Sequence, residues 1–128
     1  KLNKLIDEVK EKNNLLSHQI ILGGFSQGCM ISLQTGIKRK DKINSILGYS
    51  GKIINIENLS KNIIARPNIF LMHGDIDQIV PIDGFLEAKD FFIKNNYEIE
   101  TKIFKNCEHR IPMEGSSLGL QFIKKHLY

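Results

Sequence analysis

Short apolar runs alternate along the chain with segments of helical periodicity. The runs lie at residues 19–24, 43–49, 68–72 and 98–104, and each has the length of a buried strand. Helical spacing of apolar positions marks residues 1–14, 83–95, about 115–127 and the segment carrying Met30, Leu33 and Ile37. Because strand and helix patterns alternate, the sequence predicts an α/β fold, with a mostly parallel sheet of about four strands flanked by helices.

The first apolar run leads directly into Gly24-Phe25-Ser26-Gln27-Gly28, and a helical pattern follows. A serine between spaced glycines, placed between a strand and a helix, is typical of a nucleophile elbow. The turn holds the serine in a strained conformation, so we expect that side chains at positions 24 and 28 would collide with neighbouring elements. The bare pattern also arises by chance, but the strand and helix around it favour the functional interpretation.

A serine hydroxyl is a poor nucleophile at neutral pH, so this interpretation requires a histidine base and a carboxylate downstream. The run at 68–72 ends in a polar loop that carries Asp75 and Asp77, and the run at 98–104 is followed by His109. In a parallel sheet these loops would emerge at the same edge as Ser26. Spacing alone does not choose between the two aspartates, and a turn residue capping backbone N–H groups is the plain alternative for Asp75.

Three stretches together resemble the carboxylesterase/phospholipase family of α/β-hydrolases, which includes the acyl-protein thioesterases. They are Leu22-Gly23-Gly24-Phe25-Ser26-Gln27-Gly28, His73-Gly74-Asp75-Ile76-Asp77-Gln78-Ile79-Val80-Pro81, and His109 ahead of a last helix. The resemblance implies a serine hydrolase acting on carboxylic esters or thioesters, with no cofactor. It also implies that Ser26 is the nucleophile, Asp77 the acid and His109 the base, and that the backbone N–H of Gln27 contributes to the oxyanion hole.

The chain also departs from the family's pattern. No leucine-histidine-glycine-glycine-like loop precedes Lys1, so we expect residues 1–128 to form a single partial domain, the C-terminal portion of an α/β-hydrolase fold without its N-terminal strands and oxyanion loop. One edge of the strand at 19–24 would then be open to a separate N-terminal segment or to self-association. The alternative function is a truncated or degenerate hydrolase without turnover that acts as a binding or assembly partner. Glu108 and Arg110 flank the base where smaller residues are expected.

Composition agrees with one soluble globular unit, since 41% of the 128 residues are hydrophobic and 25% are charged. The net charge of +4 comes mostly from scattered lysines without an aromatic RNA-binding motif, so we expect a solvated basic surface and no nucleic-acid partner. The cluster Lys38-Arg39-Lys40 is expected at the negative end of the elbow helix. No segment is apolar enough for membrane insertion, and the expected partner is a small-molecule or lipid ester or thioester.

The remaining candidate residues have plain interpretations. Cys29 and Cys107 form neither a metal motif nor a disulfide framework and suit a reducing, cytoplasmic setting. Cys29 is expected in the core, and Cys107 lacks an elbow that would make it a nucleophile. His18 and His126 are expected at the surface, and His73 is expected to shape the loop that carries the acid. No metal is implied.

Overall fold

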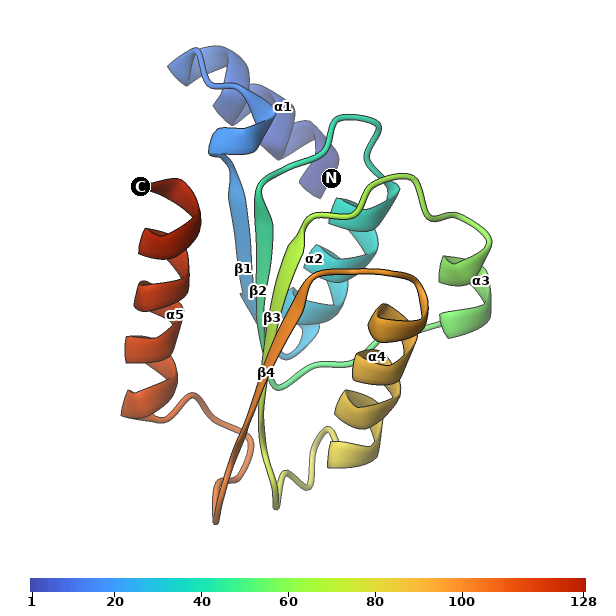
Figure 1. The fold of residues 1–128 in the computed structure, drawn as a ribbon, viewed down its shortest axis with the longest axis vertical. Helices are drawn as coiled ribbons and strands as arrows, with labels where there is room; N and C mark the ends of the chain where they lie inside the picture. Colours follow the sequence, from blue (N-terminus) through green and yellow to red (C-terminus); the bar gives the residue numbers. More distant parts are fainter.

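The computed structural model describes residues 1–128 as a parallel sheet with helices on both faces (Figure 1). The strands are β1 (Ile21–Phe25), β2 (Ser45–Tyr49), β3 (Asn68–Gly74) and β4 (Ile99–Phe104). The helices are α1 (Leu2–Asn13), α2 (Gln27–Lys38), α3 (Ile56–Ser60), α4 (Ile82–Lys94) and α5 (Met113–Leu127), with a 3₁₀ turn at Ser17–Gln19. None of the helices combines the length and the apolarity needed to cross a membrane.

The strands follow one another across the sheet in the order β1-β2-β3-β4, and every pair is parallel. This confirms the α/β class and the four predicted strands. The first strand begins at Ile21 rather than at residue 19 because the preceding residues form the 3₁₀ turn. The sequence pattern missed α3, whose five residues are too few to show a helical period and whose start is capped by the Asn55 side chain.

Side chains of the inner strands alternate between the two faces of the sheet, and both faces are buried, as is usual for parallel sheets. Ile46, Ile69 and Leu71 belong to the core beneath α2 and α4. On the opposite face, Leu47, Phe70 and Met72 pack in a second core with Phe104 and with Phe122 of α5. Figure 1 shows this layering, with α5 on one side of the sheet and α2 and α4 on the other.

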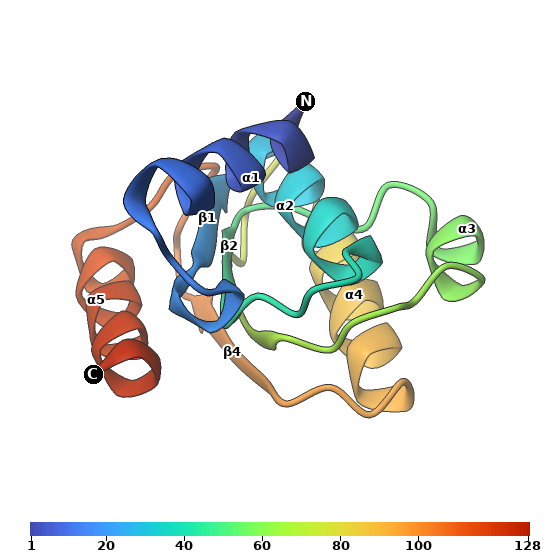
Figure 2. The ribbon, with the colours of Figure 1, turned by 90° about the horizontal axis from the view of Figure 1, so that it is seen from above.

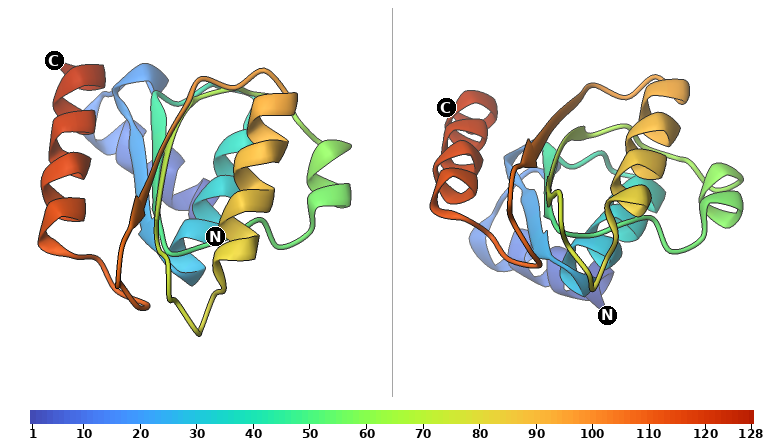
Figure 3. Two further views of the ribbon diagram at one scale, coloured as in Figure 1. Left: turned by 60° about the horizontal axis from the view of Figure 1, so that its bottom comes forward. Right: turned by 90° about the horizontal axis from the view of Figure 1, so that it is seen from below.

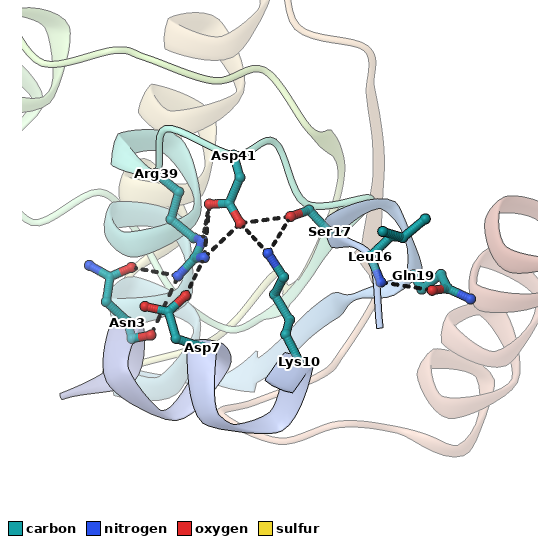
Figure 4. Close-up of polar contacts among 8 residues, drawn as sticks. All are labelled: Asn3, Asp7, Lys10, Leu16, Ser17, Gln19, Arg39 and Asp41. Carbon is teal, nitrogen blue, oxygen red and sulfur yellow. Dashed lines mark hydrogen bonds and ion pairs between the residues drawn. The ribbon is translucent and has the colours of Figure 1, made fainter. Parts of the chain in front are cut away.

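Arg39 is buried, whereas the sequence predicts a solvated basic surface. Only 6% of its side chain is exposed, and its guanidinium contacts the carboxylates of Asp7 in α1 and Asp41 at 2.8 Å each. Lys10 and Ser17 complete the network by donating to Oδ2 of Asp41 (Figure 4). The physical reason for the difference is that α1 brings acidic and amide groups over the end of α2, so the arginine ties α1 to the rest of the fold.

The same network stabilises the ionised form of Asp41. Hydrogen bonding from the Arg39 guanidinium outweighs the opposing effect of burial and holds the pKa of this carboxyl well below its ordinary value of 3.8. A carboxyl with a lowered folded-state pKa stabilises the fold above its ordinary pKa, and this contribution fades as the pH falls through the lowered value. The attachment of α1 is therefore expected to be maintained at neutral pH.

Because all four strands run in the same direction, their carboxyl ends lie at one edge of the sheet. The segments that follow β1, β3 and β4 meet there (Figure 3). The first strand, β1, lies at one margin of the sheet and has a neighbouring strand on one side only. The helix α1 lies near this margin (Figure 2).

Candidate active site

Ser26 lies in the turn between β1 and α2 with the strained backbone of an elbow. Its φ is 56° and its ψ is −117°, values that a residue with a side chain adopts only when its surroundings impose them. Gly24 makes the turn possible, because a Cβ there would lie 2.3 Å from the backbone carbonyl carbon of Gly28. The matching expectation for Gly28 is wrong: no atom lies within 4 Å of a Cβ built there, since this glycine faces open space.

The imidazole of His109 lies between Ser26 and Asp77. Its Nε2 is 2.9 Å from Oγ of Ser26, and its Nδ1 is 2.7 Å from Oδ2 of Asp77. A carboxylate only accepts hydrogen bonds, so Nδ1 carries the hydrogen and Nε2 is left to accept the serine proton. The ring also packs against Phe25, with 4.8 Å between centroids, which restricts its rotation.

The side chain of Asp77 is held in position by contacts other than the one with His109. Its side chain has no exposed surface, and its Oδ1 accepts hydrogen bonds from the backbone N–H groups of Ile79 at 2.9 Å and Val80 at 2.8 Å. Burial alone would raise the pKa of Asp77, but the hydrogen bonds from His109, Val80 and Ile79 outweigh it and hold the pKa below its ordinary value. An ionised carboxylate therefore faces the imidazole at neutral pH.

Asp75 lies outside this hydrogen-bonded chain. Its Oδ1 accepts a hydrogen bond from the backbone N–H of Cys107 at 3.1 Å, so it caps a neighbouring loop. The two loops approach so closely that a Cβ on Gly74 would lie 2.2 Å from the carbonyl oxygen of Cys107. The structure thereby separates the two aspartates that spacing left equivalent, since only Asp77 contacts His109.

His18 is exposed and Cys29 is buried, as expected. Glu108 and Arg110 are also exposed, and Cys107 is buried. Burial raises the pKa of the Cys29 thiol to about 12, which removes it as a nucleophile at neutral pH.

His126 differs from the expectation of a surface residue. Only 20% of its side chain is exposed, because its ring packs against Phe122 at 4.5 Å between centroids. Its ring thus covers Phe122, which belongs to the second core.

Gln27 is the first residue of α2, directly after Ser26. The first N–H groups of an α-helix have no partner within the helix, and they carry the positive end of its dipole. The N–H of Gln27 is thus placed where a developing negative charge next to Ser26 would be stabilised. The N–H groups of Ile79 and Val80 are the part of the site that the sequence interpretation omitted, although an aspartate that accepts from residues two and three positions later is a common turn pattern.

The chain is similar to known proteins of one family. The family model for phospholipase/carboxylesterase matches residues 1–128. Acyl-protein thioesterase 1 of Saccharomyces cerevisiae is 38% identical over 98% of this chain, and that of Aspergillus fumigatus is 37% identical over 96%. The chain spans 59% and 53% of those two relatives, respectively.

Solved structures share the fold. The esterase PE8 superposes with a TM-score of 0.95 at 29% identity, over 98% of this chain and 59% of its own. Arabidopsis thaliana SOBER1 superposes with a TM-score of 0.86 at 18% identity, over 97% of this chain and 60% of its own. With an α/β-hydrolase fold and a family match along its whole length, this chain belongs to the phospholipase/carboxylesterase family.

Proposed function

We propose that this chain supplies the nucleophile, base and acid of a serine hydrolase that cleaves carboxylic esters or thioesters. The observation that carries the proposal is the unbroken series of hydrogen bonds from Ser26 through His109 to Asp77, at 2.9 Å and 2.7 Å. Nucleophile, base and orienting acid in this geometry are the working parts of acyl transfer by a serine.

In the proposed mechanism, Nε2 of His109 takes the hydroxyl proton as Oγ of Ser26 attacks the carbonyl carbon of the substrate. The negative charge that develops on the carbonyl oxygen is stabilised by the N–H of Gln27. The imidazolium then returns the proton to the leaving alcohol or thiol, and Asp77 stabilises its positive charge throughout. Water, activated by His109, attacks the acyl-serine and releases the acid and the free serine.

The bond class is tested by offering the purified chain p-nitrophenyl butyrate, a butyryl thioester and the corresponding p-nitroanilide. We expect hydrolysis of the ester and the thioester and much slower cleavage of the anilide. The activity should be lost in Ser26→Ala and retained in Ser117→Ala, which removes an exposed hydroxyl from α5. Activity that survives in Ser26→Ala would contradict the assignment of the nucleophile.

A second candidate function, assembly with a further polypeptide segment, is favoured by the open edge of β1. The carbonyl of Ile20 accepts from Asn44, and the N–H of Ser26 donates to the carbonyl of Tyr49, so these groups point toward β2. Backbone groups alternate sides along a strand, which directs those of Ile21, Gly23 and Phe25 to the open edge. Unpaired strand edges are templates for pairing with another strand.

An apolar groove of about 470 Å³ runs beside this edge, between α1 and α5. It is lined mainly by aliphatic side chains: Leu2, Leu5, Ile6, Val9, Ile20, Ile21, Leu22, Leu47, Ile123 and Leu127. We propose that an additional apolar strand of a longer hydrolase occupies the groove, since the chain covers 59% of the yeast relative. The same segment would supply a second oxyanion-hole donor, whose loss typically lowers turnover by ~10²–10³.

In the absence of that strand, a second copy of the chain is expected to use the groove, so the purified chain should self-associate as its concentration rises. Leu5→Lys, which places a charge in the groove on α1, should shift the chain toward monomer in analytical ultracentrifugation. Leu120→Lys on α5 is the matched control, because Leu5 and Leu120 are both 54% exposed and Leu120 lies outside the groove. The proposal that the groove mediates self-association would be contradicted if the wild-type chain stayed monomeric at all concentrations, or if both variants had equal effects on association.

A further inference from the structure

His73 is a buried histidine beside the candidate site with no role in the mechanism above. It lies near the end of β3, and its side chain has no exposed surface. Its Nε2 is 2.7 Å from the carbonyl oxygen of Val80 and 3.5 Å from Oδ2 of Asp77. Since a carbonyl oxygen only accepts, Nε2 must carry a hydrogen, while Nδ1 has no hydrogen-bond partner in the protein.

The contact with Val80 places His73 at the base of the loop that holds the acid. The carbonyl of Val80 accepts from His73, while the N–H of the same residue donates to Oδ1 of Asp77. Restraining Val80 therefore restrains the donor that orients the carboxylate. The imidazole itself is held by β3 and by packing against Phe85 of α4, with 5.5 Å between ring centroids.

The second contact of His73 is with Oδ2 of Asp77, the oxygen that faces His109. Oδ2 of Asp77 accepts from Nδ1 of His109 at 2.7 Å and also lies 3.5 Å from Nε2 of His73. The carboxylate thus accepts three hydrogen bonds, from Ile79 and Val80 on Oδ1 and from His109 on Oδ2, and the ring of His73 lies beside Oδ2. Carboxylates with two or three such donors are held in one rotamer and kept ionised.

We propose that His73 is a positioning residue for Asp77: its Nε2–H fixes the turn at Val80 and so aims Oδ2 at His109. This inference rests on the proposed function of the three residues. The competing explanation is that the imidazole only fills space against Phe85. The two explanations differ in whether the N–H group or the ring is essential.

Two substitutions separate the N–H group from the ring. His73→Gln keeps an N–H donor close to the position of Nε2 but loses the aromatic ring, whereas His73→Phe keeps the ring and loses the donor. The readout is the Nδ1–H proton of His109 in ¹H NMR, which appears far downfield and exchanges slowly only while it is hydrogen-bonded to Asp77. This signal does not require turnover.

We expect the downfield signal in the wild type and in His73→Gln, and its loss in His73→Phe. Labelling of Ser26 by a fluorophosphonate should slow by ~10²-fold in His73→Phe, as for a catalytic group displaced by about 1 Å, and should be restored in His73→Gln. Retention of the signal in His73→Phe together with its loss in His73→Gln would overturn the inference in favour of packing.

A further measurement needs no variant. The ¹⁵N shifts of the wild-type His73 ring report its tautomer, and a hydrogen on Nδ1 instead of Nε2 would overturn the inference even if His73→Phe failed to fold. A downfield His109 signal without any ester hydrolysis would contradict the proposed function alone. Absence of that signal from the wild type would contradict both, because there would be no Asp77–His109 bond to maintain.

Discussion

Ser26→Ala and His109→Ala are each expected to lower hydrolysis of an activated ester by on the order of 10⁶-fold, or to the background rate where that is reached first. The two groups act as one unit, because Oγ attacks only as its proton moves to Nε2, 2.9 Å away. The double variant should therefore be no slower than either single variant. Initial rates with p-nitrophenyl butyrate, measured at one pH for all three proteins, check this.

Asp77→Asn is expected to have a smaller effect and to lower the rate of hydrolysis by about 10⁴-fold. The amide presents the wrong hydrogen-bonding pattern to Nδ1 of His109. Asp75→Asn is its control: Oδ1 of Asp75 accepts from the N–H of Cys107, and an amide oxygen can replace it. The account of a single coupled unit would be contradicted if the rate losses of Ser26→Ala and His109→Ala multiplied in the double variant. It would also be contradicted if Asp75→Asn lowered the rate as much as Asp77→Asn.

Gly24→Ala is expected to destabilise the fold by about 3 kcal/mol, at the upper end for overpacked substitutions. The added Cβ would lie 2.3 Å from the carbonyl carbon and 2.4 Å from the carbonyl oxygen of Gly28, and both atoms belong to the backbone at the start of α2. Relief of this overlap requires β1 and α2 to separate, which displaces Ser26 from His109. Urea unfolding monitored by circular dichroism measures the loss of stability.

The same substitution at the other end of the pentapeptide should have the opposite effect. Gly28 lies inside α2 with no atom within 4 Å of a built Cβ, so Gly28→Ala should stabilise the helix by roughly 0.5–1 kcal/mol. Equal destabilisation by both changes would show that the crowding at the elbow is symmetrical, contrary to the structure.

The succession of strands and main helices along the chain was predictable because hydrophobic periodicity is a local property of the chain. The runs at 43–49 and 68–72 became β2 and β3 with shifts of two residues or fewer at each end. The helix α3 was not predictable in this way, since five residues do not complete two turns. Its start depends on one capping side chain, Asn55, which periodicity does not detect.

Interactions between distant segments explain the other differences. Arg39 resembled its neighbouring lysines in the sequence, and only the approach of α1 places the carboxylate of Asp7 against it. The two glycines of the elbow look equivalent in the pattern, yet Gly24 is crowded and Gly28 is open. Spacing left Asp75 and Asp77 undecided because both contact the loop after β4, and the choice depends on which carboxylate faces the imidazole of His109 there.

The most direct test of the central claim, that Ser26 is an activated nucleophile within this chain, is the intact mass of the purified protein after incubation with a fluorophosphonate probe. We predict a single adduct that is located on Ser26 by peptide mapping and is absent from Ser26→Ala. A folded chain that gains no adduct, or an adduct that persists in Ser26→Ala, would contradict the account.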